Sequence, residues 1–270
     1  MSKNQNLKKL DGINLNDLSD HQRFYDEHLN FSGRRLTEYN ISPGIKCKFD
    51  TILKRIGAKK FNIALDVGCS GNSLIHFIPN IEQRVFLDIA HPPMIQYSQF
   101  KKYHPSNGTI TNMPFKNEIF DLITALDVLE HIPDDDLAAN EIVRILKPKG
   151  ILLVTVPHRM KYYTNQDALV GHYRRYEYEQ IKNIFKTKGL RELVSFGVYG
   201  QIMKIAFIQE TNPKKTEESL NNLRRRYTSD NIFRIIWDKI VLIGSLIMKI
   251  DAKIQPFNKI MDICLIFKKL

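Results

Sequence analysis

The sequence predicts an α/β fold: a seven-stranded, mostly parallel sheet with helices on both faces, an N-terminal helical segment, and a helical insertion before the last strand. Three observations lead to this prediction. Between positions 61 and 157, short apolar runs alternate with helix-like segments, a pattern typical of parallel strands joined by crossover helices. The hydrophobic content of 43% and the charged content of 26% are typical of a globular protein. The length of 270 residues allows one large domain with an accessory part.

Apolar runs rich in β-branched residues identify the strands. They are expected at residues 61–67, 84–89, 109–111, 120–126, 151–156, 192–198 and 262–267. Helices are expected at residues 73–78, 134–146 and 178–188. The second helix begins with three aspartates, which complement the helix dipole, and Pro148 and Gly150 break the chain after it. The third helix ends at Gly189, and the polar, aromatic segment 158–176 is expected to form a loop or lid.

Charge is distributed unevenly along the chain, whose formal net charge is +11. Residues 1–60 contribute +5, residues 61–156 contribute −4 and residues 157–270 contribute +10. We therefore expect four parts: an N-terminal helical extension or cap at 1–60, a catalytic core at 61–200, a basic and apolar insertion at 201–259, and the last core strand at 260–270. A basic periphery suits an anionic partner, such as a phosphorylated metabolite, an acidic membrane surface or nucleic acid, although general solubility also explains it.

The cysteines and the apolar segments exclude several classes of protein. Three widely spaced cysteines, with no CxxC pair, argue against a disulfide scaffold or a structural zinc site, so no metal is expected. The first 18 residues contain no apolar run of signal-peptide length, which favours a cytoplasmic protein. The apolar segment 232–250 is interrupted by four charged residues, so we expect it to lie on a membrane or in the protein interior rather than to cross a bilayer.

Two segments indicate a nucleoside-binding site. The first strand leads into a glycine-containing turn at 68–71, and Asp88 follows the second strand. Glycine allows close approach of a ligand to the backbone, and a carboxylate after the second strand can accept hydrogen bonds from both ribose hydroxyls. Only Gly68 of the G-x-G-x-x-G dinucleotide pattern is present, and there is no G-x-x-x-x-G-K-[ST] loop. An adenosine ligand without a pyrophosphate is therefore expected.

Four stretches in order carry a family resemblance: ALDVGCSG (64–71), VFLDIA (85–90), TNMPFKNEIFDLITALDVLEHI (111–132) and LKPKGILLVTVP (146–157). Together with GHYRRYEYEQIKNIF (171–185), the chain resembles class I S-adenosylmethionine-dependent methyltransferases, particularly those acting on small molecules. The resemblance implies a Rossmann-like sheet, an enzyme, and S-adenosylmethionine as the cofactor. It departs from the family's G-x-G-x-G at Ser70 and Asn72, and has Thr109 where relatives often carry an acidic residue.

Carried over by position, the resemblance implies a set of cofactor-binding residues. Asp66 and Gly68, with Ser70 and Gly71 on the same loop, would lie beside the methionine part, and Asp88 would bind the ribose hydroxyls. The remaining cofactor contacts would be Asn112 and Met113 in the adenine pocket, and Leu126 and Asp127 near the cofactor amino group.

Acceptor chemistry is expected from histidines near the same edge of the sheet. Methyl transfer is an in-line displacement for which alignment supplies much of the rate, and a histidine base helps when the acceptor is a hydroxyl. His131 and His172 are the candidate catalytic residues, while Arg174 and Tyr176 are candidate substrate-binding residues. For His131, a structural hydrogen-bonding role is the alternative.

These observations favour methyl transfer to a small-molecule or lipid-linked acceptor at oxygen. Two alternatives remain open: an RNA methyltransferase, which the basic charge favours, and a cofactor-binding protein without turnover, which the altered glycine motif favours. The segment 224–250 combines three arginines with an apolar helix whose polar residues Arg234, Asp238, Ser245 and Lys249 lie on one stripe. This helix is either buried or lies in a membrane interface against anionic headgroups.

Overall fold

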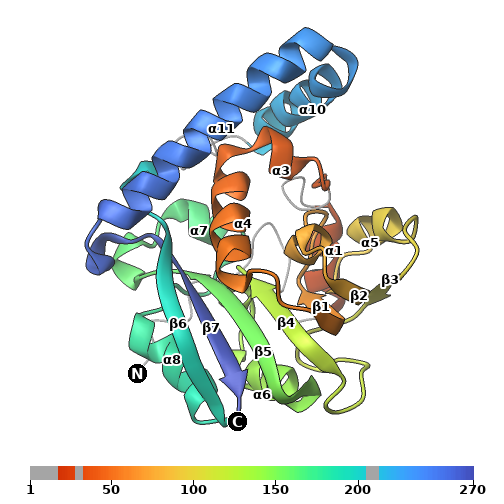
Figure 1. Ribbon diagram of the computed structural model, residues 1–270, viewed down its shortest axis with the longest axis vertical. Helices are drawn as coiled ribbons and strands as arrows, with labels where there is room; N and C mark the ends of the chain where they lie inside the picture. Colours follow the sequence, from red (N-terminus) through yellow and green to blue (C-terminus); the bar gives the residue numbers. More distant parts are fainter. Residues whose placement is uncertain (1–17, 28–32, 205–212) are drawn as a thin grey trace.

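The computed structural model describes residues 18–27, 33–204 and 213–270 (Figure 1). The predicted extension and insertion thus lie partly outside the described residues. The strands are β1 (Phe61–Val67), β2 (Ile81–Asp88), β3 (Tyr103–Asn107), β4 (Phe120–Leu126), β5 (Leu146–Pro157), β6 (Leu190–Tyr199) and β7 (Asp262–Lys269). The α-helices are α1 (Leu18–Glu27), α3 (Glu38–Ile41), α4 (Pro43–Ile56), α5 (Pro92–Tyr97), α6 (Asp135–Ile145), α7 (Asn165–Leu169), α8 (Tyr178–Lys186), α10 (Pro213–Ser229) and α11 (Asn231–Ile254). Single turns of 3₁₀-helix are η1 (Leu74–Phe77), η2 (Leu129–His131), η3 (Met160–Tyr162), η4 (Gln201–Met203) and η5 (Phe257–Lys259).

The seven strands form one sheet in the order β3-β2-β1-β4-β5-β7-β6. Strands β1 to β5 pair in parallel, and β7 pairs antiparallel with both β5 and β6. The predicted Rossmann-like, mostly parallel sheet is confirmed. The chain runs outward from β1 to β3 on one side and from β4 on the other, and an open sheet binds its ligand at the carboxyl ends of the strands where the order reverses.

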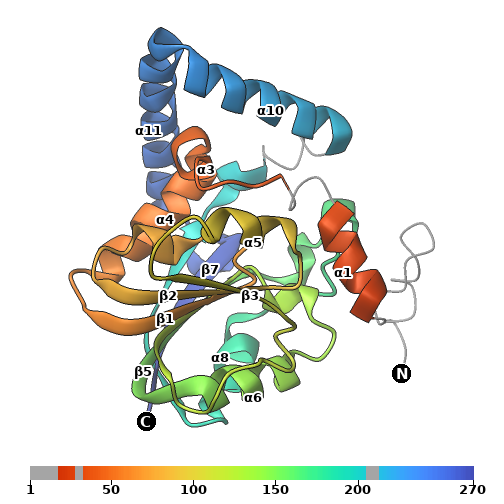
Figure 2. The same cartoon turned by 90° about the vertical axis from the view of Figure 1, so that its right-hand side faces the viewer.

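Helices cover both faces of the sheet, as Figure 2 shows with α4 and α5 on one side and α6 and α8 on the other. Neighbouring residues of β4 point to opposite faces, as the period of a strand requires. Leu122 belongs to the core shared with Ile52 of α4, and Ile123 to the core shared with Ile142 of α6. The three cysteines are free and buried, two of them in the sheet or its first loop, which agrees with a packing role.

Two local predictions were wrong. The third strand is Tyr103–Asn107, not residues 109–111. It pairs with β2 only, and an edge position tolerates the proline at 105, which is unfavourable within a central strand. In addition, β5 begins at Leu146 and runs through Pro148 and Gly150, with an irregular register against β4 at that point.

The predicted loop or lid at 158–176 contains two short helices, η3 and α7. A capping box starts α7, because Thr164 and Asp167 each satisfy a backbone N–H of the other. The segment is thus more ordered than the irregular pattern of its sequence indicates.

Helices α10 and α11 extend away from the sheet (Figures 1 and 2), and α11 packs against α4 and β6. Three of the four polar residues predicted to share a stripe on α11 face the protein. Lys249 donates to Asp50 at 2.7 Å, Asp238 accepts from Tyr227 at 2.6 Å, and Ser245 is buried.

The opposite face of α11 is apolar and exposed. Ile236 and Ile243 are 53% and 58% exposed. Further exposed residues on this helix are Ile232, Ile235, Ile240, Leu242, Leu246, Ile247, Ile250 and Ile254. The alternative in which this face is buried in the chain's own core is therefore wrong. Among the described residues, no helix combines the length and hydropathy that a membrane span requires.

Candidate functional site

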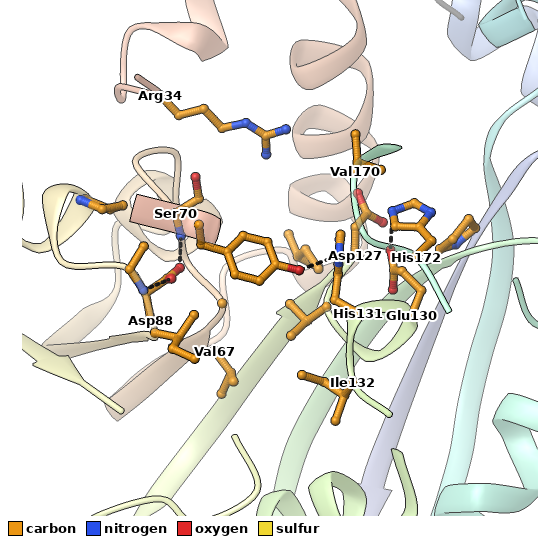
Figure 3. A pocket seen from close by; sticks show the side chains of 18 of the residues that line it. Arg34, Val67, Ser70, Asp88, Asp127, Glu130, His131, Ile132, Val170 and His172 are labelled. Carbon is orange, nitrogen blue, oxygen red and sulfur yellow. Dashed lines mark hydrogen bonds and ion pairs between the residues drawn. The ribbon is translucent and has the colours of Figure 1, made fainter. Parts of the chain in front are cut away.

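A cavity of about 440 Å³ lies at the carboxyl ends of β1, β2, β4 and β5. Its walls come from the sheet, from the loops after the strands, and from the helices that cover this edge. Tyr25 of α1, Ile45 of α4 and Arg224 of α10 contribute to the cover. Figure 3 shows Ser70 and Asp88 at one end of the cavity and Glu130, His131 and His172 at the other. The two ends have different chemistry.

The first end is built around the carboxylate of Asp88. The backbone N–H groups of Ser70 and Ala90 donate to its two oxygens at 2.7 and 2.9 Å. Burial raises the pKa of Asp88 from its usual value, against the effect of these two donors. Each oxygen accepts one backbone hydrogen bond, and a carboxylate oxygen has a second lone pair for a ligand hydroxyl. The loop after β1 and the end of β2 thus hold this carboxylate in place.

The loop after β1 makes a close backbone approach possible. Gly68 has a φ of 63°, and a Cβ at this position would lie 2.5 Å from Cγ2 of Val128. The loop then passes close to Arg34, because a Cβ on Gly71 would lie 1.8 Å from the Arg34 carbonyl oxygen. Both positions therefore require glycine for steric reasons.

The loop after β1 also carries a hydroxyl group that no group of the described residues uses. The hydroxyl of Ser70 is buried and has no hydrogen-bond partner among the described residues, so it is available to a ligand. Beside it, Ile89 and Ile110 line an apolar wall together with Gly108. This end of the cavity thus combines a carboxylate, an unused hydroxyl, a glycine turn and apolar side chains.

Of the residues predicted to form the site, seven line the cavity: Gly68, Ser70, Asp88, Leu126, Asp127, His131 and His172. Six do not: Asp66, Gly71, Asn112, Met113, Arg174 and Tyr176.

Asp66 lies beneath the loop, where its carboxylate accepts hydrogen bonds from Ser73 and Thr124. Burial raises its pKa to about 7, although the two hydroxyl groups oppose this shift. Its position indicates that it supports the glycine turn from below.

Asn112 and Met113 lie apart from the cavity. Asn112 is exposed, and Met113 is part of the core on the α6 side of the sheet. Gly108 and Ile110, a few residues earlier, line the cavity instead.

Arg174 and Tyr176 point away from the cavity and meet at Asp135, to which they donate at 2.8 Å each. Of the two neighbouring arginines in this segment, Arg175 lines the cavity; it is buried and forms a two-pronged ion pair with Asp167. Successive side chains of an extended segment point to opposite sides, so a difference of one residue exchanges the inward and outward arginines.

At the second end of the cavity, two histidines stand next to a buried glutamate. The rings of His131 and His172 are 4.5 Å apart between centroids and nearly perpendicular. Tyr25 shares a 2.8 Å hydrogen bond with Nδ1 of His131, and Asp167 with Nδ1 of His172 at 2.9 Å. Burial, and secondarily the charge of Asp127, raise the pKa of Glu130 well above its usual range.

A third group of charges consists of Asp127 and Asp262, which line the cavity, and of Lys48, which contacts both. Lys48 of α4 donates to Asp262 of β7 at 2.7 Å and also to Asp127, whose other oxygen accepts from Thr155 at 2.7 Å. Burial alone would raise the pKa of Asp127, but Lys48 and Thr155 lower it. Burial and the charge of Asp127 raise the pKa of Asp262 well above its usual range.

Sequence reasoning did not single out four residues that line the cavity, Tyr25, Arg34, Glu130 and Asp262, nor Lys48, which contacts Asp262 and Asp127. A signal for Lys48 was present, because it occupies the apolar stripe of its helix, four residues before Ile52. A lysine on a buried helix face requires acidic partners, but the amino-acid sequence alone does not identify these partners.

The strand order and the cavity at the carboxyl ends of the strands define an open α/β sheet with its ligand-binding edge where the order reverses. Residues 65–154 match the family model of a methyltransferase domain. The chain therefore carries an S-adenosylmethionine-dependent methyltransferase domain, which is the domain of an enzyme.

Two curated relatives match over about half of their length. An uncharacterised protein of Methanocaldococcus jannaschii is 34% identical over 136 residues, which are 50% of this chain and 52% of that protein. A probable S-adenosylmethionine-dependent methyltransferase of Mycolicibacterium smegmatis is 22% identical over 139 residues, 50% of this chain and 54% of that protein.

Among solved structures, one similar fold is Haemonchus contortus phosphoethanolamine N-methyltransferase 2 in complex with S-adenosylmethionine. Its TM-score is 0.58 at 19% identity, and the match covers 92% of this chain and 59% of that chain. This likeness concerns the fold.

Proposed function

We propose that the protein transfers a methyl group from S-adenosylmethionine to a hydroxyl of a lipid-linked acceptor at a membrane surface. The observation that carries this proposal is a cavity with two chemically distinct ends. One end has the carboxylate, glycine turn and apolar wall that suit the cofactor. The other has the polar cluster of Glu130, His131 and His172 that suits a hydroxyl acceptor.

At the first end, Asp88 would hold the ribose hydroxyls, and the backbone at Gly68 and the hydroxyl of Ser70 would face the methionine part. Ile89 and Ile110 would enclose the adenine. The bound cofactor supplies an electrophilic methyl group, and the chain's own residues supply alignment, which accounts for much of the rate of an in-line displacement.

At the second end, the acceptor hydroxyl would lie against the two histidines. As the new carbon–oxygen bond forms and the carbon–sulfur bond breaks, the hydroxyl proton would pass to one of the two imidazoles. Asp167 orients His172, and Tyr25 holds His131, so both rings have fixed positions. A base held by a third group in this way is the arrangement that general-base catalysis requires.

The covering helices support a membrane-held acceptor. The outer face of α11 presents ten exposed large apolar residues, which a water-facing helix does not normally do. Exposed basic residues on α10 and α11, including Arg225, Arg226 and Lys239, complement an anionic lipid surface. In contrast, Arg224 turns inward, lines the cavity and pairs with Glu38 at 2.7 Å. The helix pair that would contact lipid therefore also borders the cavity.

Methyl transfer can be followed with S-adenosylmethionine carrying a labelled methyl group. Purified protein is incubated with this cofactor and with either the membrane or the soluble fraction of a cell extract. We expect label in the organic-extractable part of the membrane fraction, and loss of that label when the extracted product is treated to cleave methyl ethers and esters. Label only in RNA would support the nucleic-acid alternative, and label in neither fraction would support a protein without turnover.

Membrane association makes a separate prediction about Ile243. The wild type should sediment with anionic vesicles at low salt and less so at high salt, because each basic residue near the surface contributes about 1 kcal/mol before screening. Ile243→Asp should abolish sedimentation without lowering thermal stability, since this side chain is 58% exposed. The matched control is Leu137→Asp on α6, 45% exposed on the other side of the sheet, which should sediment like the wild type. A wild type that stays in the supernatant, and whose dimer is broken by Ile243→Asp, would assign this face to a second copy instead.

A further inference from the structure

We propose that Glu130, His131 and His172 form a binding site for one divalent transition-metal ion. The three residues come from η2 and from the segment after α7, and each offers one ligand atom within 4.8 Å of the other two. They face one another at the acceptor end of the cavity in Figure 3. Forty-one positions of sequence separate His131 from His172, so only the fold assembles the cluster.

The strongest observation is the state of Glu130. This side chain is 0% exposed, yet neither of its carboxylate oxygens has a hydrogen-bond partner among the described residues. A buried carboxylate without partners is costly, and buried polar groups in proteins are normally hydrogen-bonded or bound to a metal. The lining of the cavity includes Glu130, so a ligand can reach it. A cation would satisfy both oxygens.

The second observation is the fixed orientation of His172. Its Nδ1 contacts Asp167 at 2.9 Å, and Arg175 holds Asp167 through a buried ion pair. Because Asp167 is charged and accepts from Nδ1–H, the lone pair of the imidazole is on Nε2. That atom lies 4.0 Å from Oε1 of Glu130, too far for a hydrogen bond. In a typical metal-binding histidine, one ring nitrogen donates to a carboxylate and the other ring nitrogen binds the ion.

The spacing of the ligand atoms is suited to an ion. Metal–nitrogen and metal–oxygen bonds of about 2.0–2.2 Å place two ligands of one ion about 3–4.3 Å apart, depending on the angle between them. The 4.0 Å between Nε2 of His172 and Oε1 of Glu130 falls in this range. All the ligand atoms lie within 4.8 Å of one another, so a contraction of at most about half an ångström brings every pair into this range.

The ligand types select the kind of ion. Two imidazoles and one carboxylate favour Zn²⁺, Co²⁺, Mn²⁺ or Fe²⁺ over Mg²⁺ and Ca²⁺, which prefer oxygen ligands. Three protein ligands leave positions open for a ligand from the cavity. This part of the inference rests on the proposed function: an acceptor hydroxyl bound to the ion would ionise more readily and release its proton to water, and the imidazoles would then act as ligands instead of as bases.

The site can be tested by metal titration of the full chain after chelation and dialysis. Calorimetry with Zn²⁺ or Co²⁺ should show one ion per chain, and bound Co²⁺ should give a visible absorption band. Glu130→Gln and His172→Gln should each weaken binding at least tenfold and remove the band. The matched control His104→Gln replaces an exposed histidine of β3 and should bind like the wild type. Equal affinity in the wild type and in both site variants would overturn the proposal.

Stability measurements separate loss of binding from loss of folding. Without metal, Glu130→Gln should be about as stable as the wild type, because an amide of the same shape replaces a buried carboxyl group that has no hydrogen-bond partner among the described residues. Added Zn²⁺ should raise the melting temperature of the wild type but not that of Glu130→Gln. Titration of the same samples with S-adenosylhomocysteine then distinguishes the two proposals. Metal binding without cofactor binding would refute the proposed function alone, and cofactor binding without metal binding would refute the metal site alone.

Discussion

Replacing Asp88 with alanine should weaken the binding of S-adenosylhomocysteine at least tenfold. The bound ligand would lose the two hydrogen bonds that its ribose hydroxyls donate to the carboxylate. Hydrogen bonds to a charged group contribute roughly 1.5–3 kcal/mol each. The substitution also removes the acceptor that holds the N–H groups of Ser70 and Ala90, so the glycine turn loses an anchor. The two effects act in the same direction.

Isothermal titration calorimetry measures this change directly. The matched control is Glu82→Ala, an exposed acidic residue at the other end of the same strand, which should leave the affinity unchanged. An Asp88→Ala variant that binds as tightly as the wild type would remove Asp88 from the cofactor site. Circular dichroism of the same sample shows whether the fold is retained.

Replacing Lys48 with methionine should destabilise the protein by about 3 kcal/mol at neutral pH, which is typical of breaking a buried ion pair. Lys48 is buried and donates to both Asp262 and Asp127, and Oδ1 of Asp262 already has no hydrogen-bond partner among the described residues. Methionine fills the same space but leaves these carboxylates without their counter-charge.

The effect should depend on pH in a defined direction. The pKa of Asp127 is lowered in the folded protein, so its attraction to Lys48 stabilises the fold above the unfolded value of 3.8. That contribution is lost as the pH falls through the lower folded pKa. The difference between the wild type and Lys48→Met should therefore narrow below pH 4.

Urea denaturation at pH 7 and at lower pH tests this account, with Lys46→Met as the control. Lys46 lies on the same helix but is partly exposed, and it pairs with Asp50 at 3.5 Å, so its loss should cost less than about 1 kcal/mol. Equal destabilisation by the two substitutions would contradict the role given to Lys48.

The central strands could be predicted because both of their faces are largely buried, so most of their residues are apolar. Strands β1 and β4 coincide with the predicted 61–67 and 120–126. The edge strand β3 reads Tyr-His-Pro-Ser-Asn and has no such pattern, because its backbone pairing with β2 decides its conformation. Local composition cannot encode a pairing that depends on a neighbour.

The candidate site could be predicted only where it follows directly from the strand ends. Asp88, Gly68 and Leu126 line the cavity because parallel strands bring their carboxyl ends to one edge. Lys48 and Glu130 acquire their environment from contacts distant in sequence. The absence of a cysteine cluster gave no information about a metal site made of histidines and a glutamate.

The central claim, that this domain binds S-adenosylmethionine at the Asp88 end of the cavity, is tested most directly by calorimetric titration of the wild type. S-adenosylhomocysteine and NAD⁺ are titrated into separate samples of the full chain. We expect one S-adenosylhomocysteine per chain and no heat of binding from NAD⁺. Binding of NAD⁺ without binding of S-adenosylhomocysteine would contradict the account.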